Sequence, residues 1–259
     1  MAERMLRPIV CTLLVTTALA AQTLTDLQRR AAAGDHDAQT ALGTLYETGD
    51  GVPLDPAHAA ALYRAAATAG HAGAQINLAT MYLDGAGVQK DAAAAVAWLT
   101  RAADGGNPLA QLNLGMIYES GEPPVKADPA QAARRYRQAA TQGLMPAQYR
   151  LARLYEAGRG VPRDLDQAAM WYRKAADQTD PAAQLRLGIL LSPGNGTRTD
   201  VVEAYKWLNL SASRWKSEAL RVEAAARRDA LEKQMTEPQV SEAIQRSLRW
   251  QDTVGMQQK

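Results

Sequence analysis

Polar side chains with the chemistry to recognise a peptide recur along this chain at one fixed spacing. They lie two or five residues after a recurring Gln, and amide and guanidinium groups in such a row bind peptide backbone and carboxylates. A solvated helix face is the alternative, since exposed polar residues need no special explanation. The residues of this polar track are Asn77, Thr80, Asn113, Arg150, Arg153 and Arg186.

Catalytic and metal-binding patterns are much weaker. The chain has no Gly-x-x-x-x-Gly-Lys loop, no His-Glu-x-x-His and no pair of cysteines. Its three histidines, His36, His58 and His71, have no Cys or carboxylate partners at ligand spacing, so we expect them at turn and capping positions. We therefore predict no catalytic residue, no cofactor and no metal site.

The elements that must position the polar track come from an internal repeat. The dipeptide Ala-Gln occurs at 38–39, 74–75, 110–111, 147–148 and 183–184, a period of 36 or 37 residues. A fixed period in this range indicates stacked supersecondary units. Three residues after each Gln the chain has Leu, and then a small residue: Leu42-Gly43, Leu78-Ala79, Leu114-Gly115, Leu151-Ala152 and Leu187-Gly188.

Each unit is predicted to be a helix, a glycine-rich turn and a second helix. Leu114 and Tyr118 are four residues apart and share one helical face, so Leu114 is expected to be buried. Glycine ends the first helix because it adopts the left-handed conformation at low cost. An Asp then caps the second helix by accepting hydrogen bonds from free N–H groups. These residues are Asp55, Asp91, Asp128, Asp164 and Asp200.

This pattern resembles the Sel-one-like repeat (SLR), a relative of the tetratricopeptide repeat. The fourth repeat carries the resemblance most fully: Ala147, Gln148, Leu151, Ala152, Tyr155, Gly158, Gly160, Val161, Asp164, Ala168, Trp171 and Tyr172. The resemblance implies an all-α fold, a right-handed α/α solenoid (superhelix) of about five helix-turn-helix repeats with a C-terminal helical cap. It also implies that the first helices line the concave face and carry the polar track, with Arg159 off the track in a turn.

Some positions depart from the pattern. The third repeat replaces the Gly-x-Gly-Val turn with a segment one residue longer, 121–125, and has Arg135 where three other repeats have Trp. The fifth repeat has Leu191 in place of Tyr. Trp98, Trp171 and Trp207 occupy a core-facing position of the second helix, so we expect them to be buried.

These features divide the chain into expected segments. We predict one elongated domain, with a signal peptide, a partial N-terminal repeat, five repeats, a cap in which Thr236 and Gln239 form a capping box, and a disordered tail. The segments are 1–20 (signal peptide), 23–33 (partial repeat), 34–69, 70–105, 106–142, 143–178 and 179–213 (repeats), 214–250 (cap) and 251–259 (tail).

The N-terminus has the composition of a secretory signal. Arg4 and Arg7 precede an apolar run from Ile9 to Ala21, and Ala18-Leu19-Ala20 has the form of a signal-peptidase site. The run is too short to span a membrane as a helix, which takes ~20 apolar residues. An uncleaved anchor is the alternative, but we expect a protein that is periplasmic or secreted, with no membrane span after cleavage.

Function follows from the repeat and the signal. Removing residues 1–20 leaves a net charge of +1 and no basic stripe, so nucleic acid is not an expected partner. We expect an exported, non-enzymatic adaptor or scaffold that binds a protein or peptide on its concave face. Two alternatives remain: an envelope polysaccharide or cell-wall binding protein, which needs exposed Trp and Tyr, and a weak β-lactamase-like hydrolase, an activity linked to cysteine-rich relatives.

Overall fold

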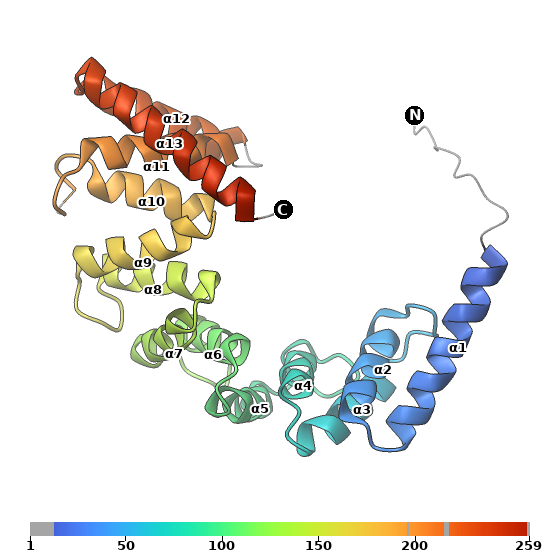
Figure 1. Ribbon diagram of the computed structural model, residues 1–259. Coiled ribbons are helices and arrows are strands. Elements are labelled where there is room, and N and C mark those ends of the chain that lie inside the picture. Colours follow the sequence, from blue (N-terminus) through green and yellow to red (C-terminus); the bar gives the residue numbers. More distant parts are fainter. Residues whose placement is uncertain (1–12, 196, 215–217, 258–259) are drawn as a thin grey trace, which may run out of the picture. The chain divides into compact units, whose positions relative to one another are not determined.

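The computed structural model describes residues 13–195, 197–214 and 218–257, and these form an all-α protein (Figure 1). The chain divides into two compact units between Asn107 and Pro108. The single elongated domain that the repeat pattern predicts stays a prediction. Each unit has buried apolar clusters of its own.

The first unit holds one helix and two complete repeats. Within each repeat the first helix packs on the second, and each second helix packs on the next repeat in the unit. The helices are α1 (Leu13–Ala32), α2 (His36–Thr48), α3 (Pro56–Thr68), α4 (Ala72–Asp84) and α5 (Ala92–Asp104).

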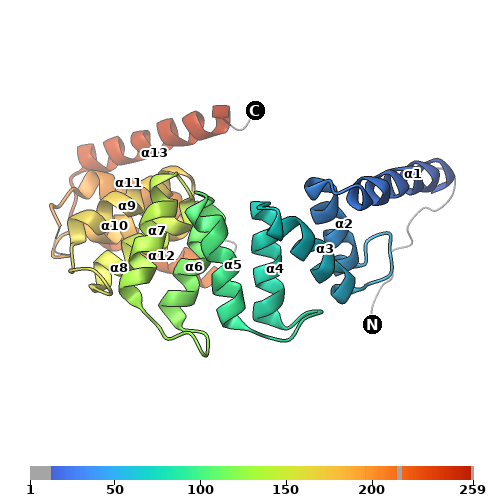
Figure 2. The same cartoon turned by 90° about the horizontal axis from the view of Figure 1, so that it is seen from below.

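The second unit holds three repeats and the C-terminal helices. Successive helices from α6 to α12 pack side by side in chain order, and α12 and α13 both pack on α11. Helix α13 runs along one edge of this unit (Figure 2). The helices are α6 (Pro108–Ser120), α7 (Pro129–Thr141), α8 (Met145–Ala157), α9 (Leu165–Asp177), α10 (Pro181–Leu191), α11 (Val201–Arg214), α12 (Glu218–Glu232) and α13 (Glu237–Gln257).

The helix ends confirm the predicted capping. The carboxylates of Asp55, Asp91, Asp128 and Asp164 accept hydrogen bonds from the first turns of α3, α5, α7 and α9. Asp200 accepts from the backbone N–H of Glu203 at 3.0 Å. Each cap satisfies a donor that would otherwise lack a partner at the helix start.

In four of the five repeats the recurring Gln ties the repeat to the preceding helix, a role that the sequence pattern did not disclose. Its side-chain amide donates to a backbone carbonyl eight residues earlier, near the end of that helix, and this carbonyl also accepts the backbone N–H three residues after it. The bonds are Gln39 to Ala31 (3.1 Å), Gln75 to Ala67 (3.0 Å), Gln148 to Ala140 (3.2 Å) and Gln184 to Ala176 (3.2 Å).

Two turn glycines pack against the repeat before them. A Cβ added at Gly87 would overlap the backbone of Pro56, and one added at Gly160 would overlap the carbonyl of Pro129. Both glycines have positive φ, 66° and 70°. These turns therefore pack directly on the first residues of α3 and α7. Glycine is required at both positions because a Cβ would overlap the neighbouring backbone and because the backbone has positive φ.

A buried carboxylate links the cap to the last repeat. Glu203 of α11 accepts hydrogen bonds from Arg173 (2.8 Å), Lys206 (3.0 Å) and the indole N–H of Trp207 (2.9 Å), and lies 3.6 Å from Arg246 of α13. Burial acts to raise the pKa of the Glu203 carboxyl, but Lys206 and Arg173 outweigh burial and hold the pKa below its usual range. The carboxylate therefore stays ionised and connects α9, α11 and α13.

The C-terminal helix is longer than the sequence predicted. The backbone N–H of Thr236 donates to the side chain of Gln239 at 2.9 Å, as in the expected capping box. The helix then continues to Gln257, with Val254 buried, where disorder was expected from residue 251. Contact between α13 and α11 explains the difference. The ring of Trp250 packs edge-on against the ring of Trp207, with their centroids 5.8 Å apart.

At the other end, α1 begins at Leu13 and packs on α2, with Leu24, Leu27 and Ala31 in its apolar contact. Residues 1–12, and with them most of the predicted signal peptide, lie outside the described residues. Among the helices that are described, none combines the length and the apolar composition that crossing a membrane requires.

Candidate protein-binding surface

The six residues of the polar track fall in both units. Asn77 and Thr80 lie on α4 of the first unit, and the other four lie on α6, α8 and α10 of the second. The structure therefore relates only Asn113, Arg150, Arg153 and Arg186 to one another. All six are on first helices, as the repeat predicted, and none is fully buried.

A tyrosine and a glutamate pair beneath the track in three repeats. The buried Tyr comes from the second helix, and its hydroxyl donates to a Glu near the end of the first helix. Burial is the main reason that the pKa of each phenol is raised above its usual value, and the carboxylate adds to the rise. The pairs are Tyr63–Glu47 (2.7 Å), Tyr136–Glu119 (2.6 Å) and Tyr172–Glu156 (2.6 Å).

Track residues of the following repeat contact these pairs. Arg150 donates to Glu119 at 3.2 Å, and Arg186 lies 3.6 Å from Glu156. In the first unit, Asn77 hydrogen-bonds the hydroxyl of Tyr63. These three side chains therefore join neighbouring repeats, a role in addition to the one that the sequence predicted.

The arginines nevertheless keep donors available. The side chain of Arg150 is 33% exposed and that of Arg186 is 47% exposed, so each ion pair uses only part of a guanidinium that has five N–H donors. Arg153, one turn beyond Arg150 on α8, is exposed and forms no hydrogen bond or ion pair with any residue that the structure describes. We call Arg150, Arg153 and Arg186 the arginine track.

The remaining track residues contribute less. Thr80 donates to the carbonyl of Ile76 in its own helix at 3.2 Å, and Asn113 is half-buried on α6. The expected position of Arg159 was wrong, because its guanidinium lies 3.9 Å from Glu119, the carboxylate that also pairs with Arg150. The sequence signal for these pairs was the Glu that directly follows Tyr in Tyr46-Glu47, Tyr118-Glu119 and Tyr155-Glu156.

Two of the three tryptophans that were expected to face the core are enclosed. Trp171 and Trp207 are buried, as predicted, and the ammonium groups of Lys174 and Lys206 lie over their rings at 4.2 and 4.0 Å. Trp98 is only half-buried, which departs from the expectation of burial. Two of the three rings are thus inaccessible for stacking on a sugar.

The histidines lie at helix ends and turns. His71 caps α4: its Nδ1 accepts from the N–H of Ala74 at 3.1 Å, and its Nε2 lies 2.9 Å from Asp37. His58 stacks on Tyr46 with ring centroids 4.3 Å apart. Within the described ranges, no three His, Cys, Asp or Glu side chains are grouped in a way that could hold a metal ion.

The chain contains one further catalytic spacing. Ser213 and Lys216 have the Ser-x-x-Lys spacing of penicillin-binding enzymes. Lys216 lies outside the described residues, and the hydroxyl of Ser213 donates to the carbonyl of Leu210 at 2.8 Å. The described contacts of Ser213 therefore include no general base that would activate it.

Comparison with known proteins agrees with the repeat pattern. A family model of the Sel1 repeat matches residues 36–71, 72–107, 108–144, 146–180 and 181–214. A Sel1 repeat protein from Oxalobacter formigenes is 29% identical, with a TM-score of 0.70 over 80% of this chain and 88% of that one. No curated protein matches the chain.

A second solved structure has the same fold. It is c5321, a protective antigen present in uropathogenic Escherichia coli strains that displays an SLR fold, and it is 26% identical with a TM-score of 0.51. The match covers 89% of this chain but 56% of that chain, so this protein spans little more than half the length of c5321. Since the family model covers well over half of the sequence in five successive repeats, the chain belongs to the Sel1 repeat family.

Proposed function

We propose that this protein is an exported, non-enzymatic adaptor that binds an acidic segment of a partner protein or peptide through the arginine track. The single observation that carries the proposal is the exposed guanidinium of Arg153, which has no partner among the described residues and follows Arg150, an arginine with free donors, on the same helix. Guanidinium groups bind carboxylates through paired, charge-assisted hydrogen bonds. The burial of Trp171 and Trp207 favours a protein partner over a polysaccharide.

Arg153→Glu is the sharpest test of this surface. We expect it to weaken partner capture about tenfold, because one charge-assisted hydrogen bond is lost and a like charge faces the partner's carboxylate. Arg153 has no partner among the described residues, so the melting temperature is expected to stay unchanged. The measurement is quantitative pull-down from an envelope fraction, with immobilised wild-type and variant proteins and a thermal melt of each.

Arg134→Glu is the matched control. Arg134 lies on α7, a second helix, is exposed and forms no ion pair with any described residue. Normal binding by Arg153→Glu together with lost binding by Arg134→Glu would assign recognition to the second-helix surface instead. Charge reversal at Arg150 and Arg186 is a poorer test, because it would place two carboxylates beside Glu119 and Glu156 and weaken the contact between repeats.

Export is proposed from the N-terminal sequence alone. We expect the mature chain to begin at Ala21 or Gln22, after the Ala18-Leu19-Ala20 site. Intact-mass spectrometry of the protein recovered from the envelope fraction measures this directly. An intact Met1 in a membrane fraction would show that the segment is an anchor and is not removed.

A further inference from the structure

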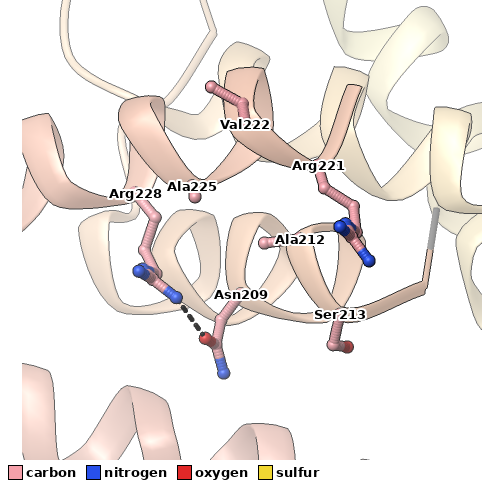
Figure 3. A pocket seen from close by; sticks show the side chains of 7 residues that line it. All are labelled: Asn209, Ala212, Ser213, Arg221, Val222, Ala225 and Arg228. Carbon is pink, nitrogen blue, oxygen red and sulfur yellow. Dashed lines mark hydrogen bonds between the residues drawn. The ribbon is translucent and has the colours of Figure 1, made fainter. Parts of the chain in front are cut away.

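A hollow between α11 and α12 has the chemistry of a second recognition site. Its volume is about 360 Å³, and it is lined by α11 on one side and α12 on the other (Figure 3). Ala212 and Ala225 form its apolar floor. The hollow exists because their short side chains leave space between the two helices. The arginine track contributes none of its lining.

Two guanidinium groups flank this floor. Arg228 donates to the side-chain oxygen of Asn209 at 3.1 Å and to Asp229 at 2.9 and 2.7 Å, which fixes its position (Figure 3). Arg221 lies seven residues earlier, two turns away on the same face of α12. It forms no hydrogen bond or ion pair within the described part of the chain, and it extends from α12 toward α11 beside Ser213.

An aliphatic side chain completes the arrangement. Val222, next to Arg221, is 60% exposed and lines the hollow with the two alanines. The site thus combines the positive charge of Arg221, which has no partner among the described residues, with a small apolar surface. A free phosphate would use only the charge, whereas an acidic side chain flanked by small aliphatic residues would use both.

We propose that the hollow between α11 and α12 binds an acidic side chain of a peptide, a Glu or Asp flanked by small aliphatic residues. Arg221 holds the carboxylate through its paired N–H donors, Arg228 offers the N–H donors that Asn209 and Asp229 leave free, and the neighbouring aliphatic group covers Ala212 and Ala225. This site goes beyond the function proposed above, since it is built from different helices and does not require the arginine track.

The test uses the full-length protein and a defined peptide. Acetyl-Val-Glu-Val-amide is titrated into protein labelled with ¹⁵N at arginine, and the Nε–Hε signals are followed by NMR. We expect saturable shifts of the Arg221 and Arg228 signals, with binding about tenfold weaker for the neutral acetyl-Val-Gln-Val-amide. Inorganic phosphate is the third ligand, and it is expected to bind more weakly than the acidic peptide.

Matched variants on α12 assign the site. Arg221→Gln is expected to weaken binding of the acidic peptide about tenfold without changing the melting temperature. Arg227→Gln removes the same charge six residues away, from an arginine already paired with Glu223 at 3.0 Å, and is expected to leave the affinity within about twofold. The proposal is overturned if the wild type shows no saturable shift with a dissociation constant below about 10 mM. It is also overturned if the Gln peptide or phosphate binds as well as the acidic peptide, or if Arg221→Gln binds like the wild type.

Discussion

Replacing Leu114 by Asp is expected to lower the free energy of unfolding by about 3–5 kcal/mol. Leu114 is fully buried in the middle of α6. The substitution removes a packed aliphatic side chain and introduces a carboxylate with no cationic partner in the repeat core. An isolated buried charge is among the largest single-residue penalties known for globular proteins.

Met116→Asp is the control for this change. Met116 lies two residues further along the same helix and is 40% exposed, so its carboxylate would remain in water. Chemical denaturation followed by circular dichroism measures both variants. An unchanged midpoint for Leu114→Asp, or equal losses for the two variants, would mean that α6 packs through another face.

Gly160→Ala is expected to cost about 3 kcal/mol, which is large for the addition of one methyl group. Left-handed backbone costs a residue with a Cβ about 1–2 kcal/mol relative to glycine. The rest comes from contact, because the new Cβ would overlap the carbonyl of Pro129 and force the turn away from the start of α7. The atoms that the new Cβ would meet belong to the backbone of Pro129 and Ala130, so no flexible side chain can move aside to make room.

Gly143→Ala separates the two contributions. Gly143 also has positive φ, 92°, but no atom lies within 4 Å of the position where its Cβ would be. Gly143→Ala is therefore expected to lower the free energy of unfolding only by the cost of the left-handed conformation, about 1–2 kcal/mol, in the same denaturation experiment. Equal losses at the two glycines would contradict the proposed contact between the turn and α7.

Two residues of the arginine track form contacts between repeats, and mutating them would disturb these contacts together with the proposed binding. Arg150 and Arg186 connect successive repeats through Glu119 and Glu156, whereas Arg153 has no such contact. A half-exposed ion pair of this kind contributes little stability, about 0–1 kcal/mol. Replacing the arginine by a neutral residue is therefore tolerated more readily than replacing it by Glu. Binding and stability are for this reason best measured together for each variant.

The sequence by itself determined the repeat and its local structure. The period of Ala-Gln, the Leu and Tyr four residues apart, and the Asp before each second helix predicted helix-turn-helix units and their capping, and the structure confirms them. These features depend on interactions within a few residues, such as a carboxylate accepting from the N–H three residues later. The family followed from the same residues.

Only the tertiary structure decided which residues of neighbouring repeats meet. The bonds from Gln148 to Ala140, the pairing of Arg150 with Glu119 and the contact of Gly160 with Pro129 all depend on how one helical pair stacks on the next. The extension of α13 to Gln257 has the same origin. Spacing along a helix fixes the face on which a side chain lies, but its partner depends on the position of the adjacent helix, which no local pattern encodes.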